Sequence, residues 1–62
     1  MAKYGLFQSG QRLPMQEFDG DYMTQDKQFV HIMERAKSAN EVDQQVAALH
    51  LDAGQSIKKI SD

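Results

Sequence analysis

The chain has 62 residues, no cysteine and a formal net charge of -2, with 40% hydrophobic and 26% charged residues. A chain of this length forms one small domain, residues 1–62, that buries only about 60% of the surface exposed by its unfolded chain. Disulfides are excluded, the charge argues against broad binding to nucleic acid, and no apolar run approaches the roughly 18 residues of a membrane span. We therefore expect a folded cytoplasmic domain that gains buried surface from a protein partner or by homo-oligomerisation.

Two short strands are expected in the first 22 residues. The apolar group at residues 4–7 is followed by a turn at residues 9–11, which contains a glycine. Pro14 cannot donate to a β-ladder, so it belongs at the start or edge of the next strand. Residues 15–22 then alternate between two faces. One face carries Gln16, Phe18 and Gly20, and the other carries Met15, Glu17, Asp19 and Asp21.

Residues 25–37 fit either a helix or a strand. The helical spacing i, i+3, i+4, i+7 is met by Phe29, Ile32, Met33 and Ala36. Residues 34–37 are also good helix formers. Against this, residues 28–33 are rich in aromatic and β-branched side chains, and the polar residues before them suit a hairpin turn. We favour a strand at residues 28–33, and the sequence alone leaves the helix open.

The same two alternatives recur in the last third of the chain. Asn40 with Asp43 can begin a helix whose apolar positions include Val46 and Leu49. In the strand interpretation, residues 46–51 form a nearly buried strand, residues 52–54 a turn and residues 56–60 an edge strand. Lysines on an edge strand discourage edge-to-edge aggregation.

The favoured fold is all-β, a small five-stranded antiparallel meander or an SH3-like barrel. The alternative is an α+β fold in which an N-terminal hairpin precedes two helices. Residues 39–60 would then resemble the helix-turn-helix of a small DNA-binding transcriptional regulator. The residues that would contact nucleic acid are Ser56, Lys58 and Lys59. The apolar residues Leu51 and Ile57 stand six apart rather than about five, which argues against this motif.

An acidic stretch runs through residues 17–26, with Glu17, Asp19, Asp21 and Asp26 and no basic residue among them. Calcium loops place a glycine after paired aspartates, whereas Gly20 lies between Asp19 and Asp21, so the stretch is interpreted as a solvated polar face. Exposed aromatic and methionine side chains are typical of recognition surfaces. We expect such exposure among Tyr4, Tyr22, Met23 and Met33. The predicted surface for a basic protein partner comprises Glu17, Asp19, Asp21, Tyr22, Met23 and Asp26.

The sequence contains few candidates for chemistry. His31 and His50 are the only histidines, and a structural zinc site would need carboxylates to complete its ligands in the absence of cysteine. A nucleophile and its base also need an enclosed pocket, which a domain this small seldom forms. We therefore expect no metal site, no cofactor and no catalytic residue, so the protein is not predicted to be an enzyme.

Three blocks of the sequence resemble, in general character, a class of known proteins. They are EFDGDYM at residues 17–23, KQFVHI at residues 27–32 and VAALHLDAGQSIKKI at residues 46–60. These blocks lie within residues 17–60, and over most of the chain the sequence resembles small proteins encoded by phages and prophages. The resemblance implies an accessory protein that binds and modulates a host protein, or that regulates phage genes, and it assigns no functional residue. We predict a non-catalytic binding module of this kind.

Overall fold

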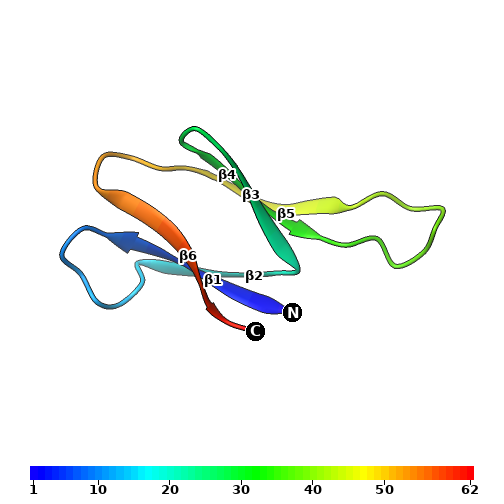
Figure 1. Cartoon of the computed structure of the whole chain (residues 1–62), viewed down its shortest axis with the longest axis horizontal. Helices are drawn as coiled ribbons and strands as arrows, with labels where there is room; N and C mark the ends of the chain where they lie inside the picture. Colours follow the sequence, from blue (N-terminus) through cyan, green and yellow to red (C-terminus); the bar gives the residue numbers. More distant parts are fainter.

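The computed structural model describes residues 1–62 as six strands in two three-stranded antiparallel sheets (Figure 1). The first sheet contains, in order, β2 (Gln16–Gly20), β1 (Ala2–Gln8) and β6 (Gln55–Ser61). The second contains β3 (Tyr22–Asp26), β4 (Phe29–Glu34) and β5 (Gln44–His50). The all-β prediction is confirmed. The helical alternatives for residues 25–37 and 39–60 are wrong, because these segments form β4, β5 and β6.

The strand expected at residues 15–22 is divided at Asp21, which explains why six strands replace five. β2 ends at Gly20 in the first sheet and β3 begins at Tyr22 in the second. Between them the N–H of Asp21 donates a 2.8 Å hydrogen bond to the carbonyl of Met33 in β4. Taken as one bent strand, β2 and β3 give the order β6-β1-β2/β3-β4-β5, which agrees broadly with an SH3-like meander. β5 and β6 do not pair, so the barrel is open between them.

The core lies between the two sheets and is small, with 8 of 62 residues buried. Ala2 and Tyr4 of β1 pack with Val30 and Ile32 of β4 and with Leu51, which follows β5. Val30 and Ile32 are completely inaccessible to solvent. Their removal from water supplies roughly 1.5–3 kcal/mol each, so these two side chains make a large contribution to a core of this size.

Burial of alternate residues explains why residues 29–34 form a strand. Val30 and Ile32 point into the core, whereas Phe29 is 54% exposed on the opposite face. The helical stripe would have buried Phe29 together with Ile32, which a strand places on opposite faces. Pairing with both β3 and β5 therefore outweighs the helix propensity of the residues that follow.

Gly20 permits the close crossing of β2 and β4. It is buried, and a Cβ added at this position would collide with the Ile32 side chain and lie 3.1 Å from the Met33 carbonyl oxygen. Only a residue without a side chain fits there, and the bend at Asp21 follows immediately. The crossing thus holds the two sheets against each other at the core.

The molecule is elongated and flat, with extents of 43 × 23 × 12 Å. The loop between β4 and β5 projects at the far end of the second sheet, away from both termini (Figure 1). The β3–β4 hairpin has a two-residue loop, in which Lys27 adopts a left-handed φ of 57°. The structure contains no helix long and apolar enough to cross a membrane.

Candidate functional site

The six residues predicted to bind a partner do not form one patch. Glu17 and Asp19 lie on the outer face of the first sheet, where Glu17 Oε1 is 3.7 Å from Lys3 Nζ. Met23 is half-buried and packs against the core. The remaining three residues lie at the bend or on β3. The bent strand therefore distributes the acidic stretch over two sheets.

Asp21 and Tyr22 organise the loop at residues 35–43. The carboxylate of Asp21 accepts a 2.8 Å hydrogen bond from the backbone N–H of Arg35. The guanidinium carbon of the same arginine lies 5.2 Å from the centre of the Tyr22 ring, within range of a cation–π contact. Both residues thus have partners within the chain, and they position the loop rather than present a free acidic surface.

Asp43 connects the far end of this loop to β3 and to the residues after β4. Its Oδ2 accepts a 2.6 Å hydrogen bond from the Tyr22 hydroxyl, and its Oδ1 accepts a 2.8 Å bond from the N–H of Ala36. The bond from Tyr22, followed by the bond from Ala36, lowers the pKa of Asp43. The same Tyr22–Asp43 bond raises the pKa of Tyr22.

The outer face of the second sheet carries an aromatic surface, defined here as the Phe29 face and comprising Phe29, His31 and His50. The rings of Phe29 and His50 meet edge to face, with centroids 4.9 Å apart and an interplanar angle of 69°. A shallow hollow of about 200 Å³ lies beside them, lined by Phe29, His31, Ala48, Leu49 and His50. Small-molecule sites usually enclose about 300–1,000 Å³, so this hollow suits a side chain of a larger partner.

Negative charge lies on both sides of the Phe29 face. Asp26 of β3 is the register partner of Phe29, and Phe29 is in turn the register partner of His50 in β5. On the far side, Asp52 Oδ1 lies 3.5 Å from Nδ1 of His50. A cation placed over the Phe29 ring would therefore meet a carboxylate on either flank.

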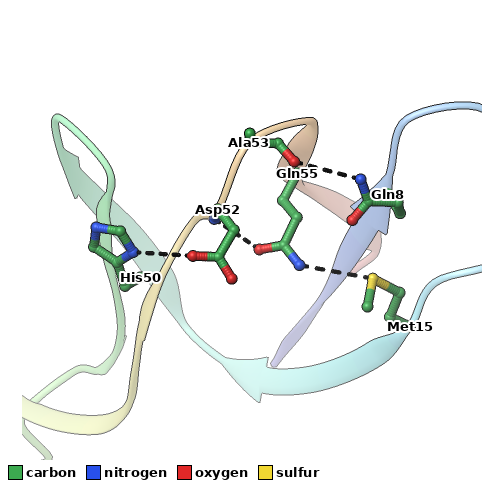
Figure 2. A network of polar contacts seen from close by, with 6 residues as sticks. All are labelled: Gln8, Met15, His50, Asp52, Ala53 and Gln55. Atoms are coloured by element: carbon green, nitrogen blue, oxygen red, sulfur yellow. Dashed lines mark hydrogen bonds and ion pairs between the residues drawn. The ribbon is translucent and has the colours of Figure 1, made fainter.

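A chain of polar contacts connects the Phe29 face to the first sheet (Figure 2). From His50 and Asp52 it continues through the Asp52 N–H, which donates to Oε1 of Gln55 at 2.8 Å. The Gln55 amide then reaches the Met15 sulfur at 4.0 Å. Nearby, the Gln8 amide donates to the carbonyl of Ala53 at 3.4 Å. These contacts bridge the open side of the barrel and fix the backbone of Asp52, whose carboxylate lies beside His50.

The three residues of the nucleic-acid alternative do not form a basic surface. Ser56 and Lys58 share one face of β6, and Lys59 lies on the other because strand residues alternate. Lys58 Nζ lies 4.5 Å from the centre of the Phe7 ring, and Lys59 pairs with Asp62. The helix-turn-helix on which this alternative depended is absent, because the segment forms two strands.

Sequence reasoning missed the Phe29 face and misplaced another aromatic. Tyr4, one of the four side chains among which exposure was expected, is a core residue with 6% exposure. The alternation of Val30 and Ile32 with Phe29 and His31 could have indicated the face once a strand was assumed. No group of three or more histidine, aspartate or glutamate side chains is placed to hold a metal ion.

Comparison with known proteins found no matching family model, curated protein or solved structure. A functional conclusion therefore depends on the geometry and charge of the chain itself. The residues that carry it are Asp26, Phe29 and His50, which lie side by side on the three strands of the second sheet.

Proposed function

We propose that the chain is a non-catalytic module that binds a protein partner through the Phe29 face. The observation that carries the proposal is the 54% exposure of Phe29 in a molecule that buries only 8 of its residues. Full burial of a phenylalanine side chain is worth about 1.5–3 kcal/mol, and folding leaves much of this unrealised. Contact with a partner would recover it, because the ring is already held in place by His50.

The proposed partner presents a lysine or arginine side chain to this face. A cation over the Phe29 ring gains roughly 0.5–1 kcal/mol at an exposed site. Asp26 and Asp52, which flank the ring pair, add charge complementarity. Of the residues expected to bind a basic partner, the proposed surface retains Asp26. It adds Phe29 and His50.

The resemblance to phage-encoded proteins supplies the biological setting of the proposal. In that setting the partner is a host protein in the cytoplasm, whose activity the module alters on binding. The DNA-binding alternative is not proposed further, since Lys58 and Lys59 face opposite sides of one strand and each already has a contact within the chain.

Affinity capture with tagged variants tests the proposal. The unmodified chain is compared with Phe29→Ala and Asp26→Asn, and with Leu13→Ala as a control that removes an exposed apolar side chain from a loop of the other sheet. We expect one protein to be retained by the unmodified chain and by Leu13→Ala, and to be lost or weakened with both variants of the Phe29 face. Recovery of nucleic acid that modest salt releases, without a protein partner, would contradict the proposal.

A further inference from the structure

The two open sheets leave four strand edges without a partner, those of β2, β3, β5 and β6. An unpaired edge displays backbone N–H and C=O groups that can pair with another strand, and native proteins usually protect it with charged side chains. Three edges follow this rule, with Glu17 and Asp19 on β2, Asp26 on β3, and Lys58 and Lys59 on β6.

β5 is the exception among the four edges. Its seven residues, QQVAALH, include no lysine, arginine, aspartate or glutamate. Gln44, Gln45, Val46, Ala48 and His50 are exposed along it, and Val46 retains 47% of its accessible surface. No other segment of the chain pairs with this edge. Its only protective feature is a bulge at Val46, where Ile32 pairs with Ala47 and Met33 with Gln45; the edge is otherwise neutral and uncovered, which suits it to pairing with another strand.

The charges on the strand edges indicate that the strand pairing with β5 belongs to a second copy of the chain. If β2 paired antiparallel with its own copy around Phe18, Glu17 would face Asp19 of the other chain, and like charges directly opposite are destabilising. A copy of β6 would bring the lysine pairs together. When β5 pairs with its copy around Ala47, the central side chains are small and no opposed pair contains a lysine, arginine, aspartate or glutamate.

The exposed area also indicates that this chain has surface to bury. A compact monomer of 7.0 kDa exposes about 4,000 Å². This chain exposes 4566 Å² and has a core of few residues. The flat shape accounts for the difference, because a layer 12 Å thick cannot shield both faces of its sheets. Association along one edge reduces this excess without a change of fold.

We propose that two copies of the chain associate through β5, which pairs antiparallel with β5 of the second copy and joins the two β3-β4-β5 sheets into one continuous sheet. The two-fold axis passes near Ala47, so each surface patch meets its own copy, as a closed dimer requires. The dimer presents two Phe29 faces on one sheet. A partner with two basic segments would then bind with increased avidity. Dimerisation itself is independent of the function proposed above.

Sedimentation velocity over a range of concentrations tests this inference with two matched variants. Val46→Lys and Thr24→Lys each add one positive charge to an exposed position, the first on β5 and the second on β3 of the same sheet. We expect the unmodified chain and Thr24→Lys to dimerise equally well. Val46→Lys should raise the dissociation constant at least about tenfold, because it places a lysine on the pairing edge. Unchanged far-UV circular dichroism confirms that both variants are folded.

Amide hydrogen exchange of the unmodified chain provides a second measurement that needs no variant. Exchange within residues 44–50 should slow as concentration rises, whereas exchange within β2 should not change. A chain that remains monomeric at about 1 mM would overturn the inference, as would equal effects of Val46→Lys and Thr24→Lys. Phe29→Ala should leave dimerisation intact, which separates this test from that of partner binding.

Discussion

The hydroxyl of Tyr22 donates a 2.6 Å hydrogen bond to Oδ2 of Asp43, and this bond connects the start of β3 to the residue before β5. Its partners stand 21 residues apart in the sequence. Because Asp43 also accepts the N–H of Ala36, one carboxylate holds both ends of the projecting loop. The loop at residues 35–43 is thus ordered by a polar contact rather than by burial.

Acid should release this loop before the core unfolds. The carboxylate form of Asp43 accepts both bonds and its pKa is lowered below 3.8, so their stabilisation is present above that pH and is lost as pH falls through the lowered pKa. We expect the protection of the Ala36 amide, measured as its exchange rate relative to an unstructured amide at the same pH, to fall on acidification. Tyr22→Phe should shift that transition upward toward 3.8. Glu41→Gln, on the same loop, should leave it unchanged; an equal shift with Glu41→Gln would contradict the assignment.

Alkaline pH should weaken the same contact through its other member. The pKa of Tyr22 is raised above 10.0, chiefly by the bond to Asp43, so the unfolded chain loses this phenolic proton first. Stability should therefore fall as pH rises above 10.0. Absorbance titration of the phenolate checks this. In Asp43→Asn the raised transition should return toward 10.0, and no movement would show that the bond is not formed in solution.

Substitution of Gly20 should disturb the crossing of the two sheets. Gly20→Ala places a methyl group against Ile32, and such overpacking costs about 1–3 kcal/mol of unfolding free energy. Gly10→Ala is the comparison, since its φ of 84° is strained but no atom lies within 4 Å of the added Cβ. Urea unfolding measures the stability of both variants. In NMR spectra of the folded proteins, only Gly20→Ala should perturb the side-chain resonances of Ile32. Full stability in Gly20→Ala would mean that the strands cross less closely.

Removal of one methyl group from the core should be measurable in so small a domain. Ile32 has no exposed surface, and Ile32→Val should lower the free energy of unfolding by about 0.5–1.5 kcal/mol. Val42→Ala is the control, because Val42 is 80% exposed and its truncation should change stability by less than about 0.5 kcal/mol. Urea denaturation midpoints compare the two, and equal effects would contradict the placement of Ile32.

A substitution in the β3–β4 hairpin loop should raise the free energy of unfolding rather than lower it. Lys27 holds a left-handed φ of 57°, which costs a residue with a side chain roughly 1–2 kcal/mol. Lys27→Gly removes that strain and adds chain entropy in the unfolded state, so we expect stability to rise by at most about 1 kcal/mol. Lys27→Val should lower it, because β-branched residues tolerate this conformation poorly. Thermal unfolding of both variants checks the sign, and a stabilising valine would contradict the backbone geometry.

Some elements could be predicted from local sequence. The turns at residues 9–11 and 52–54 were predicted from their glycines, and Gly10 and Gly54 adopt φ of 84° and 79° there. The faces of residues 16–20 followed from alternation, with Phe18 and Gly20 turned inward as expected. The division at Asp21 had no local signal, because it depends on the Met33 carbonyl of another strand.

The candidate site was harder to predict than the fold. Asp21 and Tyr22 were expected to face a partner, but they bond to a loop that follows them by more than a dozen residues. Phe29 was not among the side chains expected to be exposed. Its exposure follows from competition for one buried face, which Val30 and Ile32 fill completely.

The sequence by itself excluded disulfides and favoured an all-β domain, because alternation and glycine turns act over a few residues and need no distant partner, but it left a helix open at residues 25–37 and 39–60. The tertiary structure decided strand over helix in those segments, which face of β4 is buried and which edge is left uncovered. The physical reason is that a strand offers two equivalent faces, and only contact with the other sheet distinguishes them. That contact buries Ile32, exposes Phe29 beside His50, and leaves β5 with a neutral open edge.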